Sequence, residues 1–448
     1  MPATCKLKNI VKRDGRVVPY QGRLITDAIQ KAVAAASKPN RKLAAALKRQ
    51  VEQALSETYG SNSMPSVEEI QDVVENILMT SGHTDVARRY IIYRHQRAQA
   101  REGRSQMFEV SDNIPYKKIY EVMIWNIDHE CGTITDLNRL IQKGGYDDLV
   151  HAADQRYENE IDQAVNNLQE RLDKVRLVII AGPSSSGKTT TTIKIKEKLE
   201  ALGADLVTLN IDNYFFNLVD HPMDDFGDYD YETPQALDLK LINKHVHDLL
   251  SGKMVKTPVY NFKTGLRSLD VHPVKLKKKQ ILVLDSLHGL YGGMTSRVPK
   301  DMKFGVYVET LGQLRSEEGQ FMRWADIRLL RRMIRDMHHR NTQPMQTLTH
   351  WHYVRRSELQ HIIPFNASAD AVINTALPYE LPILKTHLSR YFPSALKKYK
   401  EDPHRLDAFI RADRIHHFMK PLKLQRDESM IPSDSLLREF IGGSQYKY

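Results

Sequence analysis

The sequence predicts an α/β protein in which a parallel sheet is flanked by helices and preceded by a smaller, mainly helical α+β region. Three observations lead to this fold class. From residue 175 onward, short apolar runs alternate with helical periodicity, as in a parallel sheet wrapped by helices. Residues 182–189 carry a phosphate-binding pattern that joins a strand to a helix. Residues 1–103 combine a hairpin signal with helical spacing of apolar residues.

The region of residues 1–103 opens with alternating residues around Asp14-Gly15, a dipeptide typical of a two-residue hairpin turn. Helical spacing follows, and Ser66-Val67-Glu68-Glu69 is a capping box that predicts the start of a further helix. A polar run over 99–105 is expected to end the region. These features predict a small α+β domain over 1–103.

Residues 104–174 are predicted to form a helical connector, and they carry no catalytic signature. Gly144-Gly145 is expected to break its helices, and the charged segment 154–174 is expected to form one long helix. The third domain, residues 175–448, holds the predicted sheet. Its expected strands are 177–181, 205–209, 281–285, 304–308 and 370–374. Ligands bind such sheets at the carboxyl ends of the strands.

Residues 182–189 read Gly-Pro-Ser-Ser-Ser-Gly-Lys-Thr, which is the pattern G-x-x-x-x-G-K-[ST] in full. Its glycines let backbone N–H groups turn inward around phosphate oxygens, and the following helix adds its positive N-terminal end. Lys188 is expected to reach the β- and γ-phosphates, and the Thr189 hydroxyl to bind Mg²⁺. The sequence therefore predicts a nucleoside triphosphate site. Its residues are Gly182, Pro183, Ser184, Ser185, Ser186, Gly187, Lys188, Thr189, Thr190 and, further along the chain, Arg340.

Two acids lie at or just after the ends of predicted strands. Asp212 comes after the run 206–209 and is expected to project beside the phosphate loop, where a carboxylate can accept the proton of a substrate hydroxyl; a simple turn aspartate is the alternative. Asp285 ends the run 281–284, as in a Walker B strand, and is expected to hold Mg²⁺ unless it is an ordinary strand-ending acid. Between the two, the acidic and aromatic residues 227–232 can bind sugar hydroxyls and stack on a base, or form a solvated loop.

Four arginines fall at positions i, i+3, i+4 and i+7 and thus share one helical face, and Arg340 follows them. A row of like charges invites an anionic partner. If the helix belongs to a lid that closes over a triphosphate, the phosphates are that partner, and the guanidinium groups stabilise the transferred phosphoryl group. A solvent-facing helix paired with nearby acids and a nucleic-acid footprint are the alternatives, and we favour the lid. The four residues are Arg328, Arg331, Arg332 and Arg335.

The composition adds weaker constraints. The net charge is +10, and because the basic residues fall into separate clusters, we favour several polyphosphate sites over nucleic-acid binding. No apolar stretch approaches membrane-spanning length, and the polar N-terminus is unlike a signal peptide. The two cysteines, Cys5 and Cys131, suggest neither a disulfide framework nor a zinc site. We therefore expect a cytoplasmic protein without a membrane partner.

From Val178 to about Lys385 the chain resembles the uridine kinase and phosphoribulokinase branch of P-loop kinases. The segments that carry the resemblance are 182–189, 211–215, 227–238, 258–267, 285–288 and 326–336. The C-terminal residues 431–444 are similar to the ending of a larger bacterial nucleoside kinase type. The resemblance implies a P-loop kinase core that uses ATP and Mg²⁺ on a nucleoside substrate.

The same resemblance implies roles for individual residues. Asp212 would be the general base acting on a nucleoside 5′-hydroxyl, with Lys188 and the four arginines at the transferred phosphoryl group. Two positions depart from the family. Gly265 stands where pyrimidine-specific members place a base-reading histidine, which leaves the base preference open, and Asp285-Ser286-Leu287-His288 replaces Glu-Gly-Ile-His. The implied substrate residues are Asp230, Tyr231, Tyr260, Phe262 and Arg267.

Residues 1–103 resemble an ATP-cone, the regulatory nucleotide-binding module of ribonucleotide reductases and their repressor. The matching segments are 11–16, 28–32 and 86–94. The resemblance implies regulation by ATP or dATP through a change of quaternary arrangement, and hence a homo-oligomer. The implied effector residues are Val11, Lys12, Arg13, Arg16, Lys31, Arg88 and Arg89.

The prediction is therefore a P-loop kinase domain, preceded by an ATP-cone and a helical connector, that phosphorylates a nucleoside 5′-hydroxyl. Two alternatives stay open. One is a sugar or sugar-phosphate kinase of the phosphoribulokinase type, and the other is a non-enzymatic nucleotide-sensing regulator that binds nucleic acid. Against the regulator, the sequence carries no zinc ribbon, helix-turn-helix signature or aromatic single-strand platform.

Overall fold

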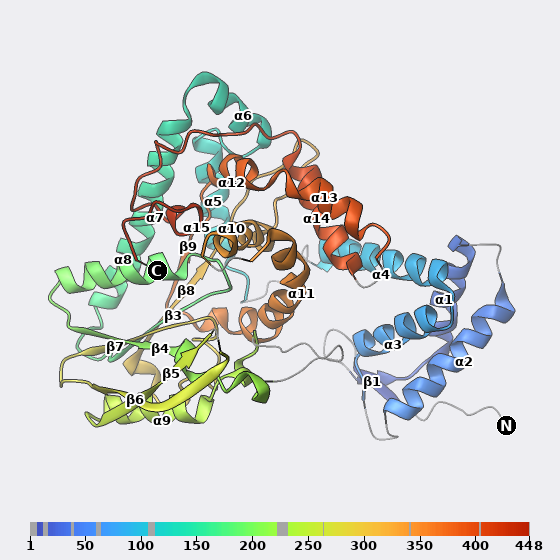
Figure 1. The fold of residues 1–448 in the computed structure, drawn as a ribbon, viewed down its shortest axis with the longest axis horizontal. Helices are drawn as coiled ribbons and strands as arrows, with labels where there is room; N and C mark the ends of the chain where they lie inside the picture. Colours follow the sequence, from blue (N-terminus) through green and yellow to red (C-terminus); the bar gives the residue numbers. More distant parts are fainter. Residues whose placement is uncertain are drawn as a thin grey trace. The chain divides into compact units, whose positions relative to one another are not determined.

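The computed structural model describes residues 7–11, 17–36, 40–59, 64–105, 113–221, 232–262, 264–339, 342–402 and 405–447. The chain divides into two compact units, Met1–Ser111 and Asp112–Tyr448 (Figure 1). Within the described residues, no helix combines the length and the apolar character that crossing a membrane requires.

The first unit packs helices against a small antiparallel sheet. In this sheet β1 (Asn9–Val11) pairs with β2 (Val17–Pro19), and the predicted turn at Asp14-Gly15 between them lies outside the described residues. The apolar faces of the helices form one core. The helices are α1 (Gly22–Ala36), α2 (Arg41–Thr58), α3 (Val67–Thr80) and α4 (Thr84–Ser105).

Two predictions about these helices have different outcomes. The capping box before α3 is confirmed, because the Glu69 N–H donates to Ser66 Oγ at 3.2 Å and the Ser66 N–H donates to Glu69 Oε2 at 2.7 Å. The polar run over 99–105 is helical, because α4 continues through it and ends at its last residue, Ser105, so the end of the region at this run stays a prediction. The run is rich in Gln, Ala, Arg and Glu, which are good helix formers whether or not they are buried.

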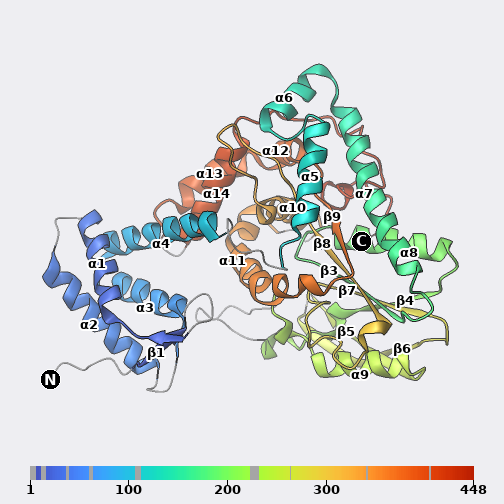
Figure 2. The ribbon, with the colours of Figure 1, turned by 180° about the vertical axis from the view of Figure 1, so that it is seen from behind.

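The second unit is built on a five-stranded parallel sheet with the strand order β4-β7-β3-β8-β9 (Figures 1 and 2). All five predicted strands are confirmed, and no end moves by more than one residue. The central strand is β3, so the loop that follows it leaves the middle of the sheet. The strands are β3 (Leu177–Ala181), β4 (Leu206–Asn210), β7 (Ile281–Ser286), β8 (Lys303–Glu309) and β9 (Ala371–Asn374).

Helices cover this sheet on both faces. The helices that the structure describes in this unit are α5 (Tyr116–Asp128), α6 (Ile134–Lys143), α7 (Tyr146–Gln169), α8 (Lys188–Ala201), α9 (Leu239–Leu250), α10 (Trp324–His339), α11 (Pro344–His361), α12 (Glu380–Leu388), α13 (Tyr391–Tyr399), α14 (Leu406–Met419) and α15 (Arg438–Ile441). A separate antiparallel hairpin pairs β5 (Met254–Asn261) with β6 (Leu266–Lys275). It was not predicted, because β6 is exposed along most of its length and no apolar run marks it.

The alternation of side chains along β3 explains why its whole sequence is apolar. Val178 and Ile180 join a core shared with α7, α8 and α10, whereas Leu177 and Ile179 join a second core shared with α9. Both faces of the strand are therefore covered, and all its residues are buried. A continuous apolar run is the expected signature of such a strand.

The helices of the predicted connector pack within the second unit. Gly144, at φ +81°, ends α6, which confirms the predicted break. The long helix after it runs from Tyr146 to Gln169 rather than over 154–174, and it lies along α8. Tyr157 Oη lies 2.8 Å from Thr191 Oγ1, and Lys194 pairs with Glu158. The division of this unit into connector and kinase domain stays a prediction.

A buried polar cluster joins α7 to α12 and to the C-terminal residues. Asp154 Oδ1 accepts hydrogen bonds from the Tyr379 hydroxyl at 2.8 Å and from the Ser435 hydroxyl at 3.2 Å. Lys194 of α8 and Asp434 also face this carboxyl group. Burial raises the pKa of Asp154 from 3.8 to about 6, although the two hydroxyls and Lys194 oppose the shift.

This raised pKa gives a prediction about stability and pH. Because the folded state keeps the Asp154 proton that the unfolded state loses above about pH 4, the contribution of Asp154 is complete below that pH and is lost as the pH rises through about 6. Asp154→Asn removes this titration. The free energy of unfolding of wild type relative to the variant should therefore fall by about 2–3 kcal/mol between pH 4 and pH 7.

Urea unfolding followed by tryptophan fluorescence tests this prediction. All three tryptophans, Trp125, Trp324 and Trp351, lie in the second unit, so their signal reports on that unit alone. Asp173→Asn, at an exposed position, is the control and should show no such pH-dependent difference. A difference between wild type and Asp154→Asn that stays constant from pH 4 to pH 7 would contradict the prediction.

Candidate active site

The phosphate loop, residues 182–187, connects β3 to α8. Two of its positions require glycine. A Cβ at Gly182 would lie 2.2 Å from the carbonyl oxygen of Val308, and a Cβ at Gly187, where φ is +87°, would lie 2.6 Å from Leu436 Cδ1. Ser185 also has a left-handed φ, of +59°. Left-handed residues in such a loop turn successive N–H groups to one side and form a concavity that binds anions.

The side chains of the loop also fit a bound polyphosphate. Ser185 and Ser186 are buried, and their hydroxyl oxygens have no hydrogen-bond partner in the described part of the chain. Buried polar atoms without partners are rare in proteins, so these hydroxyls are suited to phosphate oxygens. The first N–H groups of α8 likewise have no acceptor inside the helix. The loop therefore presents unused donors around a concave backbone.

Asp285 lies next to the central strand at the same edge of the sheet. In the register of the strands it is level with Ile180 of β3 and with Asn210 of β4. Burial raises the pKa of Asp285, Lys188 opposes this shift, and Glu439 adds to it. The structure therefore brings Asp285 near the lysine that begins α8.

The residues around Asp285 fit an Mg²⁺ ion that is also bound by phosphates of the nucleotide. Among the residues that the structure describes, no group of three or more His, Cys, Asp or Glu side chains could hold a metal ion. Mg²⁺ is commonly bound through one or two protein oxygens together with substrate phosphates and water. The Thr189 hydroxyl and the Asp285 carboxylate supply that number of oxygens.

Two arginines of the predicted row, Arg328 and Arg331, are enclosed by carboxylates of their own chain. Arg328 lies 2.9 Å from Glu309 and pairs with both oxygens of Glu358, and it also donates to the carbonyl oxygen of Ser184 at 3.2 Å. Burial lowers the pKa of Arg328, but Glu309 and Glu358 outweigh this effect and raise it above its usual range.

Arg331 is held in the same way. Its Nε and Nη2 donate to the two carboxylate oxygens of Glu380 at 2.6 and 3.0 Å, and Nη2 also donates to the carbonyl oxygen of Thr375 at 2.6 Å. Thr375 in turn donates to the carbonyl oxygen of Ser186 in the loop. The anionic partners of these two arginines are therefore acids of the protein itself, and their predicted role at the transferred phosphoryl group stays a prediction.

Of the other two arginines of the row, Arg332 contacts the loop and Arg335 faces Glu439. Arg332 Nη1 donates to Ser184 Oγ at 3.1 Å and to Glu232 at 2.9 Å, and Arg332 lines a cavity of about 330 Å³ between α10 and α11. Arg335 Nη1 lies 3.7 Å from Glu439. Arg340 lies outside the described residues. The helical face predicted from spacing is thus turned toward the phosphate loop and toward acids.

Asp212 lies at the same edge of the sheet as the loop, but further from it than predicted. It belongs to the 3₁₀ turn η1 (Ile211–Tyr214) at the carboxyl end of β4, and it is exposed. Because β7 lies between β4 and β3, Asp212 is two strands from the loop rather than beside it. The side chain of Asn213 accepts the Tyr260 N–H at 3.2 Å, which ties this turn to β5.

Aromatic side chains gather around Tyr260. The Phe215 ring centroid lies 5.6 Å from that of Tyr260 and 6.1 Å from that of Phe262, and the Tyr260 and Phe262 centroids are 4.9 Å apart. The His221 ring lies nearly parallel to Tyr260 at 6.5 Å. Arg267 instead pairs with Asp238 at 3.1 Å. The structure thus brings Tyr260 and Phe262 together, next to the turn that carries Asp212.

The hairpin position Gly265 cannot carry the base-reading histidine. Its φ is +68°, and a Cβ there would lie 2.7 Å from Leu218 Cβ, so a larger residue would be both strained and crowded. His221 lies in the aromatic cluster from another part of the chain. The predicted substrate residues Asp230 and Tyr231 lie outside the described residues.

The predicted effector site is described only in part. Val11 ends β1, whereas Lys12, Arg13 and Arg16 lie outside the described residues. Lys31 of α1 lies 5.9 Å from the ring centroid of Tyr93 in α4, which brings two of the matching segments together. The remaining effector residues, Arg88 and Arg89, are exposed on α4.

Reasoning from the sequence missed the acids that surround the loop. Glu309, Glu358 and Glu380 bind the arginines, and Glu439 binds Thr190. None of these glutamates stands in a short motif with its partner. The one available signal was the similarity of residues 431–444 to another kinase ending, which includes Glu439.

Comparisons with known proteins match both units. The family described as Phosphoribulokinase / Uridine kinase matches residues 177–380, and the family described as ATP cone domain matches residues 8–99. A uridine kinase of Deinococcus deserti is 30% identical over 195 residues, which cover 43% of this chain and 84% of that protein. A uridine kinase of Bacillus cytotoxicus is 30% identical over 202 residues, 45% of this chain and 86% of that protein.

A different relative has a shorter match at higher identity. It is named as the vitamin B12-dependent ribonucleoside-diphosphate reductase of Thermoplasma acidophilum and is 44% identical over 106 residues. The match covers 22% of this chain and 13% of the reductase. It is thus a similarity to one short part of a much larger protein.

Proposed function

Because the chain belongs to the phosphoribulokinase/uridine kinase family and is a phosphotransferase that acts on an alcohol group, we propose that it transfers the γ-phosphoryl group of ATP to the 5′-hydroxyl of a nucleoside. The observation that carries this proposal is a convergence at one edge of the sheet. The phosphate loop, Asp285 and the Asp212 turn with its link to Tyr260 all lie there.

On the donor side, the loop would cradle the phosphates of ATP, and Lys188 would reach the β- and γ-phosphates. The Thr189 hydroxyl and Asp285 would hold Mg²⁺, which neutralises phosphate charge when it is bound. Arg332, which donates to Ser184 of the loop, is the arginine that we propose to act on the transferred phosphoryl group through a small movement of its side chain.

On the acceptor side, Asp212 would accept the proton of the 5′-hydroxyl as its oxygen attacks the γ-phosphorus, and ADP would leave. Tyr260, Phe262 and Phe215 offer faces on which a base can stack. Asp230 and Tyr231 are proposed to bind the ribose. The alternatives are not favoured, because the matched family is one of kinases and the relatives over this domain are named uridine kinases.

We also propose that ATP or dATP binds the ATP-cone domain and changes activity through the assembly of a homo-oligomer. Such coupling between sites is commonly about 1–3 kcal/mol, so effects from about fivefold to about 150-fold are expected. The match of residues 8–99 to the ATP cone family supports this part of the proposal.

A coupled assay of ADP release tests the function. The full chain with Mg²⁺ and ATP is offered a panel of ribo- and deoxyribonucleosides, ribose and sugar phosphates. We expect a rate that depends on a nucleoside. The ranking of the bases then shows which base the enzyme prefers with glycine, rather than histidine, at position 265. A rate with sugar phosphates but with no nucleoside would contradict the proposal.

The effector site gives a further prediction. Lys12→Ala is expected to weaken the response of the rate to dATP at least severalfold while leaving the rate without effector nearly unchanged, because the effector site would be separate from the kinase site. Lys42→Ala, at an exposed position of α2, is the control. The measurement is the rate against dATP concentration at fixed saturating ATP. An identical response of Lys12→Ala and wild type would count against the effector site.

A further inference from the structure

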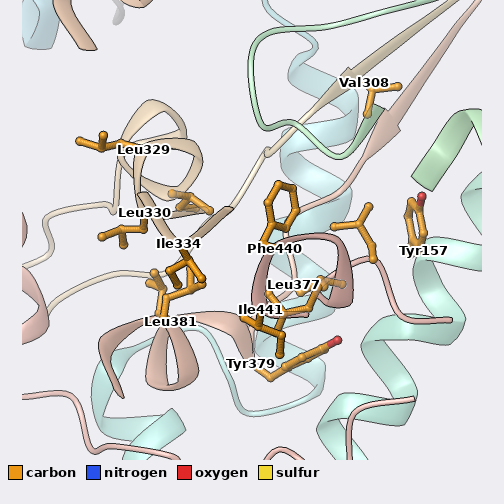
Figure 3. Close-up of a cluster of buried hydrophobic side chains, with 14 of the residues drawn as sticks. Tyr157, Val308, Leu329, Leu330, Ile334, Leu377, Tyr379, Leu381, Phe440 and Ile441 are labelled. Carbon is orange, nitrogen blue, oxygen red and sulfur yellow. The ribbon is translucent and has the colours of Figure 1, made fainter. Parts of the chain in front are cut away.

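The C-terminal segment, residues 431–445, lies against the phosphate loop. Leu436 fills the space in which a Cβ at Gly187 would stand. Figure 3 shows the Phe440 ring inside the hydrophobic core, with Leu330 and Ile334 of α10 on one side of it and Tyr157 of α7 on the other. The segment is therefore a fixed part of the second unit.

Within this segment, Glu439 places a carboxylate on the first turn of α8. Its Oε2 accepts the backbone N–H of Thr190 at 3.2 Å and the Thr190 hydroxyl at 2.7 Å. Its Oε1 lies 3.7 Å from Arg335 Nη1. The glutamate is only 3% exposed, so water does not compete for these contacts.

The N–H group of Thr190 is one of the few donors that α8 can offer to a phosphate. The N–H of Thr191 already donates to the carbonyl oxygen of Gly187 at 3.1 Å, so the N–H groups without an acceptor inside the helix are those of Lys188, Thr189 and Thr190. Donors of this kind bind the phosphates of nucleotides. Because a carboxylate and a phosphate oxygen repel each other, they cannot share the Thr190 N–H group.

We propose that Glu439 is a built-in competitor of the nucleotide, whose carboxylate occupies the Thr190 donors until the phosphates of ATP displace it. The displaced carboxylate keeps Arg335 as its ion-pair partner. Ser435 holds the backbone of the segment through Tyr379, and Arg438 holds it by donating to the carbonyl oxygens of Glu428 and Ile431. Only the Glu439 side chain therefore has to move. The proposal rests on the proposed binding of ATP at the loop.

Calorimetric titration of the full chain with ATP and with inorganic triphosphate, which has no base or sugar, tests the competition. Glu439→Gln removes the charge yet keeps an oxygen for Thr190, so we expect Kd for both ligands to fall about three- to tenfold. Glu439→Asp keeps the charge on a shorter stem that reaches Thr190 less well, and its Kd should fall by a smaller factor. Asp434→Asn, in the same segment but paired with Lys194, should change Kd less than about twofold.

The outcomes separate this proposal from the function. If the wild type binds ATP and triphosphate and both Glu439 variants bind them equally or more weakly, Glu439 supports the loop rather than competing with ligands, and the competition is wrong. A lower Kd in either variant supports the competition, even if the other variant does not fold. If neither wild type nor variants bind ATP or triphosphate, the proposed function itself is contradicted, and the competition with it.

Discussion

Replacing Asp212 by asparagine is expected to lower kcat by about 10²–10⁴-fold while leaving the affinity for ATP nearly unchanged. Asparagine keeps the size of the side chain but cannot accept the proton of the 5′-hydroxyl. The turn should survive, because the Asp212 N–H donates to Asn210 Oδ1 at 3.0 Å and the Asn213 side chain still accepts the Tyr260 N–H. The loss should therefore fall on the chemical step alone.

The measurement is the ADP-release rate at saturating nucleoside, together with Kd for ATP by titration. Asp301→Asn, an exposed acid of another turn, is the matched control and should keep the wild-type rate. If Asp212→Asn kept near-normal turnover, the proposed base would be wrong. If it lost ATP binding as well, Asp212 would belong to the donor side of the site.

Glu380→Gln is expected to destabilise the second unit by about 3–5 kcal/mol, the largest stability change that we predict. Arg331 and Glu380 are 0% and 1% exposed, and the substitution would leave the Arg331 charge buried without its counter-ion. The Phe440 ring, whose centroid lies 5.0 Å from the Arg331 guanidinium carbon, replaces little of the lost attraction.

Urea unfolding by tryptophan fluorescence measures this change in the second unit. Glu200→Gln, at an exposed position of α8, makes the same chemical change and should stay within about 0.5 kcal/mol of wild type. A loss below about 1 kcal/mol for Glu380→Gln would mean that the pair opens to water in solution. Because Arg331 also donates to Thr375, which binds the loop at Ser186, the variant should weaken ATP binding too.

The arginine row shows where reasoning from sequence succeeds and where it ends. Spacing alone predicted the helix and the common face, and α10 confirms both. The partners of that face could not be predicted, because Glu358 and Glu380 lie 30 and 49 residues from the arginines that they bind. The spacing of the arginines is the same whether their anionic partner is a ligand or a carboxylate of the protein.

Asp212 illustrates the same limit for a strand. Its position after an apolar run predicted a strand end correctly. The distance from the phosphate loop depends on strand order, and no local pattern states that β7 stands between β4 and β3. A carboxylate expected beside the loop is therefore two strands away, although it remains at the same edge of the sheet.

By itself, the sequence determined the phosphate loop, the five strands, the capped start of α3 and the family, because these depend on residues close together in the chain. Only the tertiary structure decided what encloses the loop. Thr191 and Lys194 of α8 are buried because α7 and the C-terminal segment cover a face that looks polar in the sequence. Thr190 and Glu439 meet across 249 residues, and such a contact forms only when the packing of the whole unit brings its two ends together.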